Sequence, residues 1–421
     1  MIAFQNKWDL IRHYFREAYP FEWMLAGFFA ILTFYGRSIT QNYFYLLLLL
    51  PFLMALTRAD LKDLLRNRVL MAFAIYLGAL WCSLLWNDHT APSTALGVLR
   101  GQFVQLGFVA LIAWILNRKR DHAELVVGGA LGLALFGAFI VSLTFSFDTI
   151  AKGGRISLLM WPNPNTGAAV TGVVVLLLGS GLIKSRVKWL RPMLAAILVG
   201  LLIELVLSSS RATLLALAVA SIAGLIIWRG IKPLFFSASA FLVILSIGQL
   251  AGLSPLTGLA RGDGARLEVW RAFWRPIEEN IWRGIGVDRQ FSVVFTIAGG
   301  PVDNPHSILL VSLLYGGIAA GIAWIGLVVA MAYSSFSDAW RERRSLALTM
   351  FLFLTVHGLF EGVLLVEMPN WQWIYALLPI GCVAAASFDQ SRLSVPGLQG
   401  TDVDKSRAPV ATEQSKRRST S

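Results

Sequence analysis

Long apolar runs alternate with short polar segments along most of the chain, and this pattern dominates the sequence. A helix needs about 20 mostly apolar residues to cross the hydrocarbon core of a bilayer. Runs of about that length fall at residues 21–36, 42–57, 69–86, 94–116, 125–147, 164–183, 193–207, 212–228, 234–252, 306–335, 346–366 and 372–387. The pattern predicts an all-α, polytopic integral membrane protein of about twelve transmembrane helices.

The polar segments divide the chain into four parts. Residues 1–252 hold the first nine predicted spans, and residues 306–387 hold the last three. Between them lies a loop, 253–305, that is far longer than an ordinary connection and is therefore expected to have a function. The segment 388–421 is rich in serine, threonine, glutamine and basic residues, which predicts a disordered basic tail.

Composition excludes several classes of protein. The 421 residues are 56% apolar and only 14% charged, with a mean hydropathy of +0.66. Soluble proteins are less apolar and carry nearly twice that share of charge, so a soluble enzyme and a nucleic-acid-binding domain are both excluded. The two cysteines, Cys82 and Cys382, lie in apolar runs and predict neither a disulfide framework nor a metal cluster.

The net charge of +12 is best explained by topology. Most of the 36 lysines and arginines fall in segments that share one side if the N-terminus is cytoplasmic. Cytoplasmic loops of membrane proteins are enriched in basic residues. We therefore predict that both termini are cytoplasmic and that the loop 253–305 faces the outer side.

The long outer loop contains an amphipathic segment. Its apolar residues recur at helical spacing until about Pro276. They are Leu267, Trp270, Trp274 and Ile277. Tryptophans settle at headgroup depth, so the segment is predicted to be a helix at the membrane interface. Its arginines either anchor that helix alone or also hold a lipid-borne phosphate.

Two similar tripeptides open predicted spans at the outer face. They are Asn163-Pro164-Asn165 and Asn304-Pro305-His306. Asparagine suits the N-cap and proline suits the first helical position, so both tripeptides are predicted to start helices. The positive ends of both helix dipoles would then face the same layer. Ordinary helix starts explain the Asn-Pro pairs, but they do not explain His306.

Three outer-side residues are candidates for chemistry. His306 is predicted in the first turn of its helix, where nearby positive charge disfavours the imidazolium and leaves a neutral ring that can act as a general base. Arg211 follows three serines at a helix start, which is typical of an anion site. Arg155 lies on the same side just before the sixth span. The alternatives are a structural histidine and arginines that snorkel to the interface.

At this point the order and sidedness of several motifs resemble the O-antigen ligase and polymerase superfamily. The resemblance covers roughly residues 150–330 in motif and the whole chain in topology. It rests on these segments: Gly154-Arg155, Asn163-Pro-Asn-Thr-Gly167, Ser208-Ser-Ser-Arg-Ala212, the arginine- and tryptophan-rich loop, Trp282-Arg-Gly-Ile-Gly286, Pro305-His-Ser307 and Gly316-Gly317.

The resemblance implies a C-type membrane glycosyltransferase of the bacterial inner membrane with a periplasmic active site. Within that superfamily the sequence is most similar to the ligases that transfer a glycan from undecaprenyl diphosphate to the lipid A–core. The resemblance implies that this transfer needs no cofactor, no metal and no nucleotide sugar. The family's catalytic histidine maps onto His306. Its diphosphate-binding arginines map onto Arg211 and, less securely because other loop arginines are close, onto Arg266.

Further residues complete the expected site. Arg155, on the same outer side, joins the arginines expected to hold the diphosphate, and Asn165, in the tripeptide that opens the sixth span, is a supporting residue. A family acidic residue in the last outer loop corresponds to Glu361 or Glu367, with Glu361 the expected supporting residue. The sequence offers no well-placed carboxylate pair for a covalent intermediate, which favours direct displacement with inversion at the anomeric carbon.

Other functions remain open on the sequence alone. An O-antigen polymerase or a protein O-oligosaccharyltransferase would use the same donor with a different acceptor. A lipid-glycan transporter is a further alternative, because Arg100 and Glu204 fall within predicted spans, where charges are costly and often functional. Against a transporter, the distinctive polar residues are predicted to gather at one membrane face rather than near the midplane.

Overall fold

The structure is a computed structural model of the chain. It describes residues 9–35, 37–86, 91–151, 154–158, 161, 163–229, 264–289, 291–295, 300–342, 345–362, 364–365 and 369–393. The predicted span 234–252 and the tail from residue 394 onwards lie outside the described residues.

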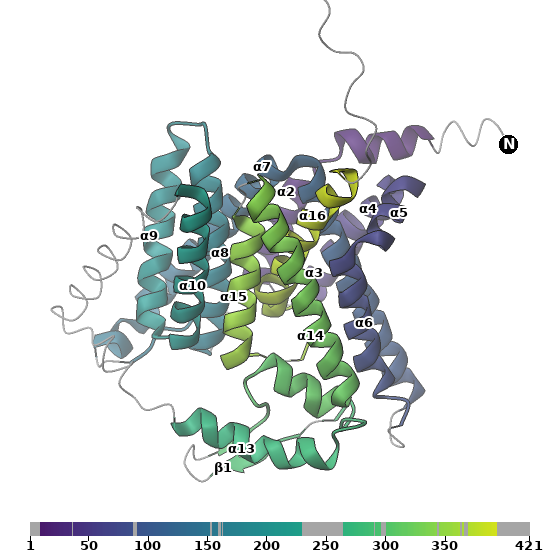
Figure 1. Cartoon of the computed structure of the whole chain (residues 1–421). Helices are drawn as coiled ribbons and strands as arrows, with labels where there is room; N and C mark the ends of the chain where they lie inside the picture. The colour runs from purple at the N-terminus through teal and green to yellow at the C-terminus, as the bar shows by residue number, and fades with distance from the viewer. Residues whose placement is uncertain are drawn as a thin grey trace, which may run out of the picture.

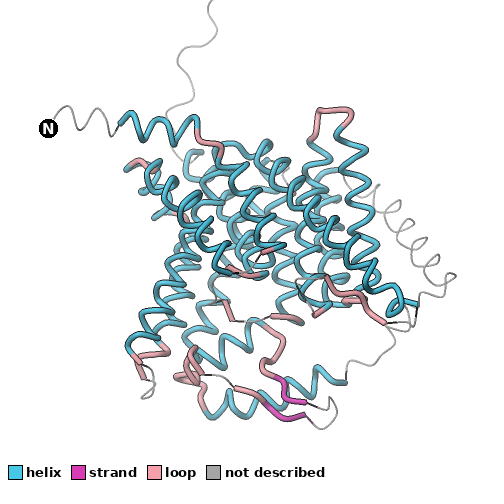
Figure 2. The backbone as a smooth tube through the Cα atoms, turned by 180° about the vertical axis from the view of Figure 1, so that it is seen from behind, coloured by secondary structure: helices cyan, strands magenta, loops and turns pink. Residues whose placement is uncertain are grey.

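The described chain is almost entirely helical, which confirms the predicted dominance of helix (Figures 1 and 2). Its α-helices are α2 (Phe21–Phe34), α3 (Arg37–Tyr43), α4 (Leu50–Ala55), α5 (Arg58–Arg66), α6 (Arg68–Cys82), α7 (Pro92–Ala151), α8 (Pro164–Lys184), α9 (Leu190–Ser208), α10 (Arg211–Arg229), α13 (Gly264–Glu279), α14 (Ile308–Glu342), α15 (Leu346–Phe360) and α16 (Leu378–Leu393). Three π-helical turns accompany them: η1 (Tyr14–Ala18), η2 (Phe44–Leu49) and η3 (Trp373–Leu377).

The predicted spans agree with the helices in position better than in number. Every predicted span in the described part of the chain overlaps a helix. By length and composition, however, 5 described helices could cross a membrane, or 6 if the pair α5 and α6, bent by 70°, counts as one span. Several other apolar helices are shorter, such as α2 and α15. The chain is therefore a multi-helix protein with membrane-capable helices, and the count of twelve stays a prediction.

Two long helices contain internal breaks. In α7 the backbone leaves helical geometry at Lys119, within the basic segment that was predicted to separate two spans. In α14 the break is at Gly317, whose φ is +65°. A Cβ there would lie 2.8 Å from the Trp282 carbonyl oxygen, so only glycine fits. The loop before α14 contacts this break, because Ile318 N–H donates to the Ile281 carbonyl at 2.6 Å.

This contact explains two of the sequence motifs together. The backbone N–H groups of Ile285 and Gly286 donate to the carbonyls of Leu314 and Tyr315, at 2.8 and 3.0 Å. The segment Trp282–Gly286 is thus bonded directly to the interrupted part of α14. The small residues at the break let the two backbones approach, and this fixes the segment Trp282–Gly286 to the bundle.

The amphipathic helix of that loop forms, but its buried face differs from the predicted one. Val269, Phe273 and Ile277 are buried in α13, whereas Leu267 and Trp274 are 53% and 49% exposed. The correct stripe has a strict four-residue spacing, and the sequence pattern could not separate the face toward the protein from the face away from it. The helix also continues past Pro276 to Glu279, because proline removes only one hydrogen bond so close to the helix end.

A two-stranded antiparallel sheet follows α13 and corrects the all-α prediction locally. Strands β1 (Val293–Phe295) and β2 (Gly300–Val302) pair with Val293 opposite Val302. The hairpin leads directly into the turn that carries His306. At the other end of the chain, α16 extends to Leu393, beyond the predicted end of the last span at residue 387.

The basic connections and the outer loop lie at opposite ends of the bundle. Figure 1 shows the N-terminal segment and the connection between α8 and α9 at one end, with α13 and β1 at the other. These two basic segments thus lie at the end of the bundle opposite α13. Which end faces the cytoplasm stays a prediction.

Candidate active site

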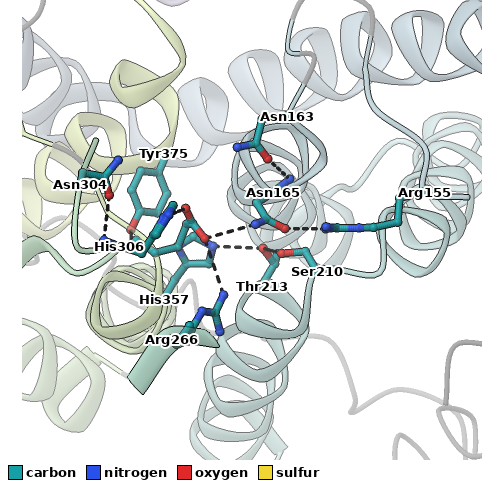
Figure 3. A network of polar contacts seen from close by, with 11 residues as sticks. Arg155, Asn163, Asn165, Ser210, Thr213, Arg266, Asn304, His306, His357 and Tyr375 are labelled. Atoms are coloured by element: carbon teal, nitrogen blue, oxygen red, sulfur yellow. Dashed lines mark hydrogen bonds and ion pairs between the residues drawn. The ribbon is translucent and has the colours of Figure 1, made fainter. Parts of the chain in front are cut away.

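Three side chains from separate parts of the chain contact one buried carboxylate, that of Glu361 (Figure 3). His306 Nδ1 lies 2.8 Å from Glu361 Oε1, and Asn165 Nδ2 donates to Oε2 at 3.3 Å. Arg266 Nη2 lies 3.6 Å from the same Oε2. The Glu361 side chain is 10% exposed, whereas those of His306 and Arg266 are 31% and 27% exposed. The carboxylate is therefore covered by side chains that a substrate can reach.

The two Asn-Pro tripeptides supply two of these contacts through the same kind of turn. Asn163 Oδ1 accepts a hydrogen bond from the Asn165 N–H at 2.9 Å, and Asn304 Oδ1 accepts one from the His306 N–H at 2.8 Å. In each turn the third residue then contacts one oxygen of Glu361. The tripeptides thus hold an amide and an imidazole against the same carboxylate.

The first tripeptide starts a helix as predicted, and the second does not. Asn163 caps α8, with Pro164 in the first turn. His306 instead has a φ of +51°, and α14 begins only at Ile308. The prediction that His306 lies in the first turn is therefore wrong. Histidine is one of the residues that adopt left-handed backbone more readily than most, and this conformation stops a helix from starting at His306.

Arg155 lies beside the first turn. Its Nη2 donates to Asn165 Oδ1 at 2.5 Å, and its Nε donates to the Ser208 carbonyl at 2.6 Å. Ser208 ends α9, where a cation is favourable against the negative end of the helix dipole. The contacts of Arg155 therefore connect the end of α9, through Asn165, to Glu361.

Arg211 is the first residue of α10, as predicted from the serines before it. Helix α9 ends at Ser208, and Ser209, with a φ of +51°, reverses the chain. Ser210 occupies the position before the helix, and its carbonyl accepts from Leu214 N–H at 3.0 Å. The turn between α9 and α10 is therefore tight, and it places Arg211 at a positive helix end.

Arg266 is the loop arginine that the structure brings to the site. Besides its ion pair with Glu361, its guanidinium lies 6.0 Å from the centre of the Phe360 ring. Arg271 and Arg275 lie on the exposed side of α13, and Arg275 pairs with Glu279. Arg261 lies outside the described residues. Among the loop arginines that the structure describes, Arg266 is placed against Glu361, and its role in binding diphosphate stays a prediction.

Glu361 rather than Glu367 is the acidic residue with described contacts, since Glu367 lies outside the described residues. Glu361 follows the last residue of α15, and its N–H donates to the His357 carbonyl at 2.8 Å. Burial raises the pKa of this carboxyl, but the hydrogen bond from His306 and the neighbouring positive charges outweigh burial, so the pKa lies below the usual value. The carboxylate is therefore ionised at neutral pH.

Sequence reasoning missed the buried layer beneath this carboxylate. Thr213, His357 and Tyr375 are each 0% exposed. The Tyr375 hydroxyl donates to the Glu361 carbonyl at 3.1 Å, and His357 shares a hydrogen bond with Thr213 at 3.1 Å. A histidine inside an apolar run was the available signal, but spacing alone could not show which helix it faces.

Within the part of the chain that the structure describes, no group of three or more histidine, cysteine, aspartate or glutamate side chains could hold a metal ion. The metal-free reaction stays a prediction.

The fold and the site define a multi-helix membrane protein with an arginine-flanked histidine and carboxylate at one end of the bundle. Residues 195–325, which include Arg211, Arg266 and His306, match the family model described as O-antigen ligase. The chain is also similar to an O-antigen ligase of Pseudomonas aeruginosa, with 31% identity over 134 residues.

The matched part covers 31% of this chain and 32% of that relative, about a third of the relative's length. Both matches make the central part of the chain similar to O-antigen ligases, in agreement with the motifs. The residues Asn163–Asn165 and Glu361 lie outside the family-model match, and their contacts with His306 and with each other connect them to the site.

Proposed function

We propose that the protein is an O-antigen ligase that transfers a glycan from undecaprenyl diphosphate to a sugar hydroxyl of the lipid A–core. The observation that carries the proposal is the contact between His306 and Glu361, 2.8 Å apart, with Arg266 on the same carboxylate. Similarity to O-antigen ligases supports a glycosyltransferase-type reaction in O-antigen or lipopolysaccharide assembly.

His306 is the general base of the proposed reaction. If Nδ1 carries the proton that bonds to Glu361, Nε2 holds the lone pair and accepts the proton of the attacking hydroxyl. The ionised Glu361 then stabilises the imidazolium that forms. The left-handed turn and the Asn304 hydrogen bond fix the direction of the ring. A base held in this way needs little reorganisation during the reaction.

Arginines and helix starts hold the leaving group. In the proposal Arg211, at the start of α10, and Arg266 contact the diphosphate, and Arg155 adds positive charge behind Asn165. A guanidinium binds phosphate oxygens in pairs, and a helix N-terminus adds favourable dipoles. Charge developing on the diphosphate is stabilised as the bond to the sugar breaks.

The bonds change in one displacement. The acceptor oxygen attacks the anomeric carbon, the bond to the diphosphate oxygen breaks, and the electron pair leaves with the diphosphate. His306 takes the hydroxyl proton. A single displacement inverts the anomeric configuration. Nothing in this sequence of steps calls for a cofactor or a metal ion, so full activity in chelator is expected.

The acceptor decides between the proposed ligase and its relatives. Purified protein should be given one lipid-linked glycan donor and, in parallel, lipid A–core, a second lipid-linked repeat unit, or a pilin-like protein. We expect transfer only to lipid A–core. Transfer to the second repeat would identify a polymerase, and transfer to the protein would identify a protein O-oligosaccharyltransferase.

The transporter alternative is tested in liposomes loaded with lipid-linked glycan. Glu204 is buried, but Arg100 is exposed on α7, so these two residues do not form the buried ion pair that a transport pathway could use. Movement of the lipid-linked glycan across the bilayer without any new glycosidic bond would contradict the ligase proposal. His306→Ala protein is the control for background transfer.

A further inference from the structure

A buried row of three hydrogen-bonded side chains, Ser210, Thr213 and His357, lies next to the proposed site (Figure 3). Ser210 Oγ and Thr213 Oγ1 share a hydrogen bond of 3.0 Å, and Thr213 Oγ1 and His357 Nε2 share one of 3.1 Å. All three residues are buried, with exposed fractions of 2%, 0% and 0%. One hydroxyl can donate to one neighbour and accept from the other, so Thr213 can satisfy both bonds at once.

These hydrogen bonds join the start of α10 to the end of α15, the two helix ends that carry residues of the proposed site. Ser210 immediately precedes Arg211, the first residue of α10. His357 lies in the last turn of α15, and its carbonyl accepts the N–H of Glu361 at 2.8 Å. Thr213 therefore lies between the helix start with a proposed phosphate-binding arginine and the helix end with the carboxylate that orients His306.

The packing around Thr213 leaves little freedom for these helices to shift. A Cβ added to Gly172 of α8 would lie 2.5 Å from Phe353 Cζ and 3.0 Å from Thr213 Cγ2. The Phe353 ring stacks on His357, with centroids 5.6 Å apart. Helices α8, α10 and α15 thus meet closely at Thr213. In such a junction a lost hydrogen bond changes relative helix position rather than being absorbed locally.

From this arrangement we infer that Thr213 is a positioning residue of the transfer reaction. Its hydroxyl, bonded to Ser210 and to His357, fixes the distance between Arg211 and the pair His306–Glu361. The inference rests on the proposed function, because it needs Arg211 and His306 to act on the same substrate. Thr213 itself touches neither substrate nor reacting atoms.

The test compares variants that keep the shape of the side chain. Thr213→Val removes the hydroxyl, and Thr213→Ser keeps it. His357→Phe removes the same hydrogen bond from the other side and keeps a ring against Phe353. The matched control is Thr33→Val, because Thr33 is 1% exposed and its hydroxyl donates only within α2, to the Phe29 carbonyl at 2.9 Å.

Purified, monodisperse protein should be assayed for kcat, for KM of the lipid-linked donor, for the pH–rate profile and for melting temperature. We expect Thr213→Val to lower kcat roughly 10- to 100-fold per folded enzyme, since small misplacements of reacting groups have effects of this size. The donor KM and the shape of the pH profile should stay unchanged, because every charged group remains. His357→Phe should lower kcat as much as Thr213→Val does, while kcat of Thr213→Ser and Thr33→Val should stay near the wild-type value.

A double-mutant cycle then separates positioning from general stability. In an Arg211→Ala background, Thr213→Val should add little further loss, because the arginine it positions is already gone. An equal loss in both backgrounds overturns the inference, as does a Thr213→Val enzyme with wild-type kcat or one altered only in melting temperature. Wild-type transfer by Arg211→Ala and His306→Ala would instead contradict the proposed function itself, whatever Thr213→Val does.

Discussion

The two Asn-Pro tripeptides of this chain make the same turn and have different outcomes. In both, the asparagine side chain accepts a hydrogen bond from the N–H two residues on, and the third residue contacts Glu361. The first turn continues into α8 at once. The second is interrupted by the left-handed His306, and α14 starts two residues later.

The difference indicates what each turn is for. Asn163 has a structural task, because it caps a buried helix, and Asn165 reaches Glu361 from that rigid start. In the second turn the chain is not helical at His306, and the left-handed backbone there holds the imidazole ring in one direction. Non-glycine residues in left-handed backbone are uncommon, and such conformations are often found at functional sites. The comparison therefore separates a turn that starts a helix from a turn that holds the proposed catalytic group.

The largest effect is expected from removing the imidazole of the second turn. His306→Ala should abolish transfer, since general base catalysis typically contributes about 10²–10⁴-fold. Donor binding should remain, because the arginines proposed to hold the diphosphate are unchanged in this variant. Glycan-modified lipid resolved on a gel and binding of labelled donor to purified protein measure the two quantities. Loss of donor binding would assign His306 to substrate binding rather than to proton transfer.

The next largest effect is expected from replacing the two arginines proposed to bind the diphosphate, which lie outside both turns. Arg211→Ala and Arg266→Ala should each lower kcat/KM by about 10²–10³-fold, as for the loss of one charge-stabilising donor. Lysine at either position should restore part of the activity, because it supplies the charge but not the paired donors. The protein should still accumulate in the membrane. Normal transfer by Arg211→Ala would make that residue an interfacial anchor only.

A smaller loss is expected when the carboxylate shared by both turns becomes an amide. Glu361→Gln should lower kcat on the order of a hundredfold, because the ring of His306 loses the charge that orients it and stabilises its protonated form. The low pKa of Glu361 means that the wild-type carboxylate stays ionised through neutral and mildly acidic pH, so the substitution should matter throughout that range. A variant with wild-type kcat would remove Glu361 from the account.

The smallest effects distinguish the two turns most finely. Asn163→Ala should lower protein stability by about 1 kcal/mol, the usual contribution of an N-cap, with only a modest loss of activity. Asn304→Ala should do the reverse, lowering kcat severalfold while the melting temperature barely changes, because its turn caps no helix. Melting curves and initial rates of the same preparations measure both. Equal behaviour of the two variants would remove the distinction between the turns.

The sequence predicted the elements of the site better than their arrangement. Helix starts at Asn163 and Arg211 follow from capping and proline preferences, which are local and were confirmed. The left-handed His306 and the buried face of α13 depend on what each segment packs against, and a single sequence does not contain that information. Likewise, only the fold could bring Glu361, Asn165 and His306 together. Nothing in local spacing connects residues so distant along the chain.

The central claim, that His306 takes the acceptor proton, is tested most directly by single-turnover transfer with His306→Gln. Glutamine keeps approximate size and hydrogen-bonding capacity but cannot accept the proton. With saturating donor and lipid A–core, the account predicts a rate at least about a hundredfold below wild type, with unchanged donor affinity. A glutamine enzyme that transfers glycan at a near-normal rate would contradict the account and leave the site with arginines but no base.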